Sequence, residues 1–222
     1  DYPHRKVFST HDITKFCHPG GNTLLVTAWH WGVTTFSHCP QPAGLYYRLT
    51  TDGKPVAVSG AHTLCRRNPH YISHREKLIT WILGYSFRYD AAGEETPWHP
   101  AFPTGYAPRL YPRPIANLEL WDTVWGNAIG GNGSTHFLLD LGREEVGFLE
   151  LHLESSDPQN ILITYGEHLV DGAVPRIIGD RDFSVEYGAA SGKNRYLNPF
   201  RRLGCRYLEV FCEKPVKFLT MG

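Results

Sequence analysis

The feature that most constrains the fold of this chain is a two-residue period in its hydrophobicity. Apolar and polar residues alternate in short runs that are bounded by Gly, Asn, Asp or Pro. Alternation is typical of strands with one buried face, because successive side chains of a strand point to opposite sides. The 3.6-residue period of amphipathic helices is nearly absent. The sequence therefore predicts an all-β protein made of antiparallel β-sandwiches.

The clearest single element is a hairpin over residues 45–59, LYYRLTTDGKPVAVS. Two β-rich runs flank Asp52-Gly53, a pair that readily adopts the positive φ angles of a tight turn. A second turn is predicted at Asp171-Gly172 for the same reason. Five further strands are predicted over residues 22–29, 149–154, 161–165, 206–211 and 215–220.

A proline-rich segment divides the chain at residues 97–114, where six of eighteen positions are proline. Proline lacks the backbone N–H that a sheet requires, so regular structure is not expected there. We predict one β-sandwich over residues 1–96, a linker over 97–114 and a second β-sandwich over 115–222. The aromatic residues of the segment leave open an alternative, in which it wraps over a surface as ordered, extended chain.

Charge and hydropathy disfavour several classes of partner. The net charge is zero, so no overall field steers the chain toward nucleic acid. No run of about twenty apolar residues predicts a membrane span, and no basic-then-apolar leader predicts a signal peptide. The five cysteines, none of them in a CxxC pair, are Cys17, Cys39, Cys65, Cys205 and Cys212. They are predicted to be buried, reduced thiols, which favours a cytoplasmic over a secreted location without fixing it.

Two pairs of carboxylates are candidates for the acid and base of a glycosidase. Glu144 and Glu145 are neighbours in LLDLGREEVGFLELHLE, so in a strand they point to opposite faces and cannot act on one bond. Asp180 and Asp182 have the i, i+2 spacing that places side chains on one face, about 6.5 to 7 Å apart. That separation suits some glycosidases. The arginines interleaved with the aspartates favour an ion-pair cluster instead.

No other motif carries catalytic or metal chemistry. His70 and His74 have the i, i+4 spacing of a helical zinc site, but Pro69 indicates a loop and the HEXXH glutamate is missing. No GxSxG elbow occurs. No cofactor or metal is predicted; calcium stays an open alternative that no EF-hand-like spacing supports. The arginines within residues 195–206 alternate with aromatic residues, as cross-strand packing requires, which disfavours a nucleic-acid-binding face.

Aromatic content is the unusual feature of the composition, with six tryptophans and twelve tyrosines. A tryptophan offers a flat apolar face to the C–H side of a sugar ring, while nearby polar groups bind the hydroxyls. The candidate carbohydrate-binding residues are Trp29, Trp31, Trp121 and Trp125. The alternative for each is packing in a sandwich core or a domain interface.

Four motifs of the second half occur together in a known family. In chain order they are DLGREEVGFLEL (140–151), YGEHLVDGAV (165–174), RDFSVEY (181–187) and FRRLGCRYLEV (200–210). This set resembles the β-sandwich that precedes the catalytic barrel of bacterial alpha-L-rhamnosidases, family 78 of the glycoside hydrolases. DITKFCHPGGNTLLVTA (12–28) resembles the sugar-binding-like jelly-roll of these enzymes, a pattern shared with other glycosidases. The first sandwich is accordingly expected to be an incomplete jelly-roll, with strands of the family missing before Asp1.

The resemblance implies the non-catalytic accessory β region of an alpha-L-rhamnosidase-like hydrolase. The acid and base of that family lie on an (α/α)6 barrel, for which this sequence has no helical series. The expected partner is therefore such a barrel, in the parent chain or in trans, and the chain alone is expected to be inactive although its parent is a glycosidase. The GREE stretch (142–145) is then the start of a sandwich strand, where glycine permits a bend.

Two alternatives stay open. The first is a free-standing, lectin-like protein that binds rhamnose-containing glycans through its tryptophans. The second is a structural or interaction protein, whose mark would be a large exposed apolar patch.

Overall fold

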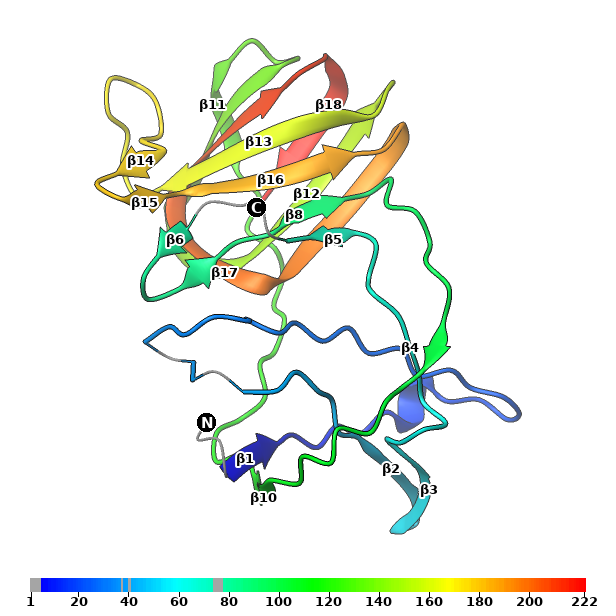
Figure 1. Ribbon diagram of the computed structural model, residues 1–222. Coiled ribbons are helices and arrows are strands. Elements are labelled where there is room, and N and C mark those ends of the chain that lie inside the picture. Colours follow the sequence, from blue (N-terminus) through cyan, green and yellow to red (C-terminus); the bar gives the residue numbers. More distant parts are fainter. Residues whose placement is uncertain (1–4, 37, 40, 74–77) are drawn as a thin grey trace. The chain divides into compact units, whose positions relative to one another are not determined.

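The computed structural model of the chain describes residues 5–36, 38–39, 41–73 and 78–222. Regular structure in these residues is almost entirely β, with a single short 3-10 helix, η1 (Thr14–Phe16) (Figure 1). The all-β prediction is confirmed. The chain forms two compact units: unit 1 comprises Asp1–Arg67 and Pro97–Leu120, and unit 2 comprises Asn68–Thr96 and Trp121–Gly222.

The described residues of unit 1 form three two-stranded ladders. Strand β1 (Arg5–Phe8) pairs in parallel with β10 (Arg109–Pro112), and β4 (Leu64–Cys65) pairs antiparallel with β9 (His99–Pro100). The third ladder is the hairpin of β2 (Arg48–Thr51) and β3 (Lys54–Val58). Its turn residues Asp52 and Gly53 have φ angles of 48° and 74°, so the predicted hairpin is confirmed.

For unit 1, one prediction is wrong and a second is not confirmed. Residues 22–29 were expected to form a strand, but they are not in a strand in the structure. Alternation alone does not make a strand there, because a strand needs a neighbour to accept its backbone hydrogen bonds. The linker over 97–114 is not confirmed either, since this segment supplies β9 and β10 to unit 1. The domain boundaries expected at 96 and 115 remain a prediction, and the units divide the chain elsewhere.

Unit 2 is built on one eight-stranded sheet. Its order is β11-β12-β17-β13-β16-β8-β5, and β18 pairs with β12 off this path. The strands are β5 (Tyr71–Ile72), β8 (Arg88–Asp90), β11 (Asn127–Gly131), β12 (His136–Ser155), β13 (Gln159–Gly166), β16 (Ser184–Ala189), β17 (Gly192–Cys212) and β18 (Val216–Met221). Two small hairpins belong to the same unit: β6 (Leu78–Thr80) with β7 (Gly84–Tyr85), and β14 (Ile177–Ile178) with β15 (Arg181–Asp182).

The two longest strands, β12 and β17, give unit 2 its core. They pair with each other along most of their length, and β17 curves strongly in Figure 1. The first part of β12 also pairs with β11, whereas residues 151–155 pair with β18, so the two ends of β12 belong to different parts of the sheet. Leu149, Leu151 and Leu153 alternate inward from β12 and are 3%, 0% and 0% exposed. They pack in one cluster with side chains of β13, β16 and β17.

Most strands and turns predicted for the second half are confirmed. The predicted runs 161–165 and 206–211 lie within β13 and β17, and β18 covers nearly all of 215–220. Asp171 and Gly172 have φ angles of 51° and 80° and close a turn between Val170 and Ala173.

The prediction of buried thiols is correct for Cys205 and wrong for three other cysteines. Cys205 packs in the core of unit 2, and Cys212 is partly buried and packs against that core. Cys17, Cys39 and Cys65 are exposed, and all three belong to unit 1. The physical reason is that unit 1 offers little buried volume to receive a thiol.

Candidate functional site

The neighbouring glutamates of the GREE stretch lie at an irregularity of β12. The register with β17 shifts between Asp140 and Glu145, as it does at a β-bulge. Gly142 has a φ angle of 83°, and its N–H donates to Asp140 Oδ1 at 2.7 Å. Glu144 is exposed, whereas the less exposed Glu145 accepts a hydrogen bond from Arg143 Nε. This arrangement fits a structural role and not a catalytic pair.

The second carboxylate pair forms an ion pair instead of an acid and base. Asp182 is 7% exposed, and it accepts hydrogen bonds from Nε and Nη2 of Arg176 at 3.1 and 3.0 Å. The hydroxyl of Ser184 also donates to it. The hydrogen bonds between Arg176 and Asp182 raise the pKa of Arg176. Asp180 is exposed and precedes β15. The predicted ion-pair cluster is confirmed for Asp182, with the difference that its carboxylate is buried.

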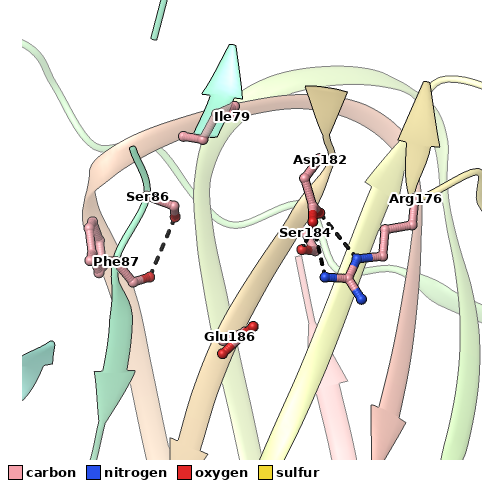
Figure 2. Close-up of a pocket in the computed structure, with 7 residues that line it drawn as sticks. All are labelled: Ile79, Ser86, Phe87, Arg176, Asp182, Ser184 and Glu186. Atoms are coloured by element: carbon pink, nitrogen blue, oxygen red, sulfur yellow. Dashed lines mark hydrogen bonds and ion pairs between the residues drawn. The ribbon is translucent and has the colours of Figure 1, made fainter. Parts of the chain in front are cut away.

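The ion pair lies on the wall of a shallow hollow in unit 2, which we call the β16 hollow (Figure 2). It is lined by Ile79, Ser86, Phe87, Arg176, Asp182, Ser184 and Glu186. Sequence reasoning missed this site because its residues come from two segments, 79–87 and 176–186, that are distant along the chain. Neither segment carries a recognisable motif, so the available signal was the mixture of charged and hydroxyl residues around Asp182.

Two of the predicted tryptophans, Trp29 and Trp31, meet in unit 1. Their rings are stacked, with centroids 5.0 Å apart and planes 11° from parallel. The ring of His38 lies 6.3 Å from that of Trp31. Both tryptophans are partly buried, so each ring already uses one face on an aromatic neighbour. The pair fits packing as well as it fits binding.

The other two predicted tryptophans belong to unit 2, and Trp125 stands beside a polar network. Trp125 is 41% exposed, and its ring centroid lies 5.0 Å from that of His152 on β12. His152 Nε2 and Glu150 Oε1 are 2.9 Å apart, and Arg195 Nη2 donates to the same oxygen at 3.2 Å. The hydroxyl of Thr123 donates to Glu150 Oε2. We call these five residues the Trp125 surface.

The alternation of β12 explains why this surface forms. Glu150 and His152 point outward at positions that alternate with the buried leucines. The pKa of Glu150 is lowered, first by the hydrogen bond from Thr123 and then by those from His152 and Arg195, against the effect of burial. Sequence analysis named the tryptophan but missed its partners. The signal that could have found them was the outward face of the LELHLE run.

Trp121 is 87% exposed and contributes an open apolar ring close in sequence to the Trp125 surface. Three arginines of β17 have separate partners, so these three do not form one basic face. Arg195 pairs with Glu150, and Arg206 donates from Nε and Nη2 to Asp140 at 2.9 Å each. Arg201 is buried and donates to Ser86, Ser184 and Tyr165.

The candidate zinc pair is only partly described. His70 Nδ1 lies 2.8 Å from the carbonyl oxygen of Asp90, and its ring stacks on Tyr89. His74 lies outside the described residues. Within the described part of the chain, no group of three or more His, Cys, Asp or Glu side chains could hold a metal ion. In the same residues, no helix has the length and apolar character of a membrane span.

Comparison with solved structures gives several alpha-L-rhamnosidases. That of Streptomyces avermitilis, complexed with L-rhamnose, is 19% identical over 77% of this chain and 18% of its own, with a TM-score of 0.58. That of Dictyoglumus thermophilum is 16% identical over 56% of this chain and 16% of its own, with a TM-score of 0.45. The family 78 rhamnosidase of Bacillus sp. GL1 is 23% identical over 43% of this chain and 10% of its own, with a TM-score of 0.34.

Of these three structures, only the Streptomyces avermitilis enzyme, with its TM-score of 0.58, is similar enough to support the fold. This chain spans less than a fifth of the length of each of the three enzymes. A comparison with curated proteins gives no match.

The sequence of residues 132–217 matches the family model of the bacterial alpha-L-rhamnosidase concanavalin-like domain. That range contains β12, β13, β16 and β17 and hence most of the core of unit 2. Over residues 132–217 this chain is therefore similar to the concanavalin-like domain of bacterial alpha-L-rhamnosidases.

Proposed function

We propose that this chain is the non-catalytic accessory β region of an alpha-L-rhamnosidase-like glycoside hydrolase. Its partner is a catalytic (α/α)6 barrel, in the same protein or in trans, which carries the acid and base. The observation that carries the proposal is the match of residues 132–217 to the concanavalin-like domain of these enzymes.

The placement of the carboxylates supports the non-catalytic part of the proposal. A glycosidase needs two carboxyl groups across one bond, one of them free to give a proton. Asp182 is held by Arg176, and Glu150 by three donors, so both are committed to hydrogen bonds that favour the charged form. Glu144 and Glu145 lie on a bulge of β12 with different exposure.

The test is turnover of p-nitrophenyl alpha-L-rhamnoside by the purified chain. We expect no release of nitrophenol above a heat-denatured control. Release that follows saturation kinetics and disappears on heating would contradict the proposal.

Adding a separately purified rhamnosidase barrel tests the partner, because association of the two proteins in sedimentation velocity is expected. Reading the coding sequence beyond Gly222 adds a second check, since a helical array with acidic residues is expected there.

A second candidate function is carbohydrate binding at the Trp125 surface. The observation that favours it is the partly exposed indole ring of Trp125, which lies beside the polar network of His152, Glu150 and Arg195. Such a ring covers the apolar side of a sugar while charged groups bind hydroxyls. Trp29, Trp31 and Trp121 are weaker candidates for the same role. Calcium is not part of this proposal.

Calorimetric titration with a rhamnose-containing oligosaccharide tests this second function. Trp125→Ala is expected to remove the binding heat. Trp98→Ala is the matched control, because Trp98 is 43% exposed and its ring packs against Arg66 in unit 1. Equal losses in both variants, or no heat with the unmodified chain, would argue against the Trp125 surface and leave the accessory role intact.

A further inference from the structure

Two hairpins of unit 2 expose large apolar side chains. The first is formed by β6 and β7, and the second by β14 and β15. Strand β6 contacts β15, and Figure 1 shows both hairpins projecting at the same margin of unit 2. Six side chains of these hairpins are between 44% and 70% exposed, and we call them the hairpin patch: Trp81, Ile82, Leu83, Tyr85, Ile177 and Ile178.

The residues that flank the first hairpin are buried, in contrast to the patch. Ile79 precedes the turn and Phe87 follows β7, and both belong to the buried hydrophobic residues of unit 2. Ile79 and Phe87 line the β16 hollow together with Arg176 and Asp182 of the second hairpin. The two hairpins are therefore anchored on unit 2, while the apolar side chains of the patch stay outside.

The turn of the first hairpin is fixed by Thr80. The Thr80 hydroxyl accepts hydrogen bonds from the N–H of Ile82 at 3.1 Å and from that of Leu83 at 3.0 Å. The Thr80 carbonyl also accepts from the N–H of Leu83, at 3.2 Å. A turn that is fixed in this way loses little conformational entropy when a partner covers it. Tryptophan, which the turn presents as Trp81, is among the residue types that contribute most to binding at protein interfaces.

The second hairpin is fixed by Arg176 and has balanced charge. The Arg176 side chain donates to Asp182, and its carbonyl accepts from the N–H of Phe183 at 2.8 Å. Residues 176–182, RIIGDRD, contain two arginines and two aspartates. Surfaces that bind anionic lipid combine apolar residues with an excess of basic ones. The composition of this hairpin therefore favours a protein partner over a lipid surface.

The size of the hairpin patch indicates which kind of protein covers it. Six apolar side chains that are about half exposed offer on the order of 500 Å². A stable complex of two free proteins needs about 800 Å² from each partner, whereas domains of one protein share interfaces of about 600 to 1,500 Å² in total. A second copy of this chain would have to pack the same projecting hairpins against each other, because a twofold interface uses one surface twice. The patch therefore suits a domain of the same protein that offers a complementary groove.

We propose that the hairpin patch is the docking surface of unit 2 for the catalytic (α/α)6 barrel, with Trp81 inserted into an apolar groove between two helices. This inference rests on the accessory role proposed above, for which it names the contact surface. A helical barrel offers such grooves, because rows of side chains on each helix form ridges with grooves between them. The projecting turn supplies the ridge, and its aromatic side chain fills the groove.

The test is calorimetric titration of the full chain with a separately purified rhamnosidase barrel. Trp81→Ser should raise the dissociation constant about tenfold or more, and Ile82→Ser should raise it less. The matched control is Ile129→Ser, which should leave the dissociation constant unchanged. Ile129 lies on β11 of the same unit, outside the patch, and Ile82 and Ile129 are both 51% exposed. Amide hydrogen exchange at residues 80–85 should slow when the barrel is added.

The unfolding of the variants shows whether the patch is free in the chain itself. Trp81→Ser and Ile82→Ser should leave the urea midpoint unchanged, because both side chains are exposed. A clear fall of the midpoint would mean that the patch is already packed within this chain, and it would overturn the proposal.

The binding results separate the docking surface from the accessory role. Equal affinity of Trp81→Ser and the unmodified chain for the barrel would overturn the docking surface and leave the accessory role intact. Failure of the unmodified chain to bind the barrel would overturn the docking surface together with the proposed partner. Dimerisation of the chain alone that Trp81→Ser abolishes would identify a second copy as the occupant and refute the proposal. Binding to vesicles of phosphatidylcholine and phosphatidylserine that needs Trp81 would refute it as well.

Discussion

Unit 1 and unit 2 contain similar β-type sequence, yet only unit 2 assembles it into a buried core. In the described residues of unit 1, Thr35 is the one buried residue, and Leu25, Phe36 and Phe102 are 68%, 86% and 87% exposed. In unit 2, Leu151 and Leu153 are 0% exposed. The difference shows that alternation sets the tendency to form strands but does not by itself produce a core.

Strand length accounts for the contrast. Strands β12 and β17 have 20 and 21 residues and pair with neighbours on both edges, so their inward side chains meet across the curved sheet. Among the described residues of unit 1, the longest strand is β3, which has five residues and pairs with β2 alone. Isolated two-stranded ladders are marginal in water because they bury little apolar surface.

The largest expected effect is on core leucines. Leu151→Ala should lower the free energy of unfolding by about 2 to 5 kcal/mol, because a fully buried side chain leaves a cavity. Leu25→Ala in unit 1 should change it by less than about 0.5 kcal/mol. Urea unfolding followed by circular dichroism measures both. Equal losses would mean that unit 1 has a core of its own and would break the comparison.

Thiol reactivity gives the next largest effect and needs no mutation. Burial raises the pKa of Cys205 to about 12, so its thiolate is scarce at pH 8. Cys17, Cys39 and Cys65 of unit 1 are exposed. With Ellman's reagent under native conditions we expect three fast thiols and a Cys205 reaction about a thousandfold slower, since three pKa units separate its folded value from the ordinary 9.0. Rapid labelling of Cys205 would show that the core of unit 2 opens readily.

An effect of intermediate size is expected when the two aspartates of the RIIGDRDF segment are compared by their contribution to the free energy of unfolding. Asp182→Asn loses charged hydrogen bonds from Arg176 in a buried place, at a cost of about 2 kcal/mol in the free energy of unfolding. Asp180→Asn alters an exposed side chain and should cost less than about 0.5 kcal/mol. Thermal unfolding of the two variants at pH 7 compares them. If Asp180→Asn lowered the stability more than Asp182→Asn, the ion pair of Asp182 would not be the main stabilising contact of this segment.

Acid should weaken unit 2 through its carboxylates. The pKa of Glu150 is lowered from 4.5, so the folded state holds its proton less tightly than the unfolded state does. The stabilisation is therefore fully present above pH 4.5 and is lost as the pH falls through the lower folded value. Glu150→Gln should flatten the pH dependence of the urea midpoint between pH 3 and 6. Glu144→Gln, which removes an exposed glutamate of the same strand, is the matched control.

The sequence was sufficient where local chemistry decides the outcome. The turns at Asp52-Gly53 and Asp171-Gly172 were predictable because few residues tolerate positive φ. The LELHLE run showed its buried face through three alternating leucines. The sequence predicted that Gly142 forms a bend at the start of a strand. In the structure the register shift occurs at this position inside β12, which begins at His136.

Long-range pairing could not be predicted in the same way. Alternation in residues 22–29 resembles that of β13, but nothing local indicates whether a partner strand will be available. The β16 hollow joins Ser86 to Glu186, and the Trp125 surface joins Thr123 to Arg195. Both depend on which distant segments the curved sheet brings together, a property of the whole unit and not of any run of residues.

The smallest expected effect separates turn chemistry from core formation. Gly53 and Gly172 have φ angles of 74° and 80°, and at both positions an added Cβ would meet nothing within 4 Å. Alanine at either site therefore costs only the backbone strain of the left-handed region, about 1 kcal/mol. Gly172→Ala should lower the urea midpoint of unit 2 accordingly, because its turn joins β13 to strands of the core. Gly53→Ala should leave that midpoint unchanged, since β2 and β3 pair only with each other and their local opening is not coupled to the core. Equal shifts in the two variants would mean that the hairpin of unit 1 unfolds together with unit 2.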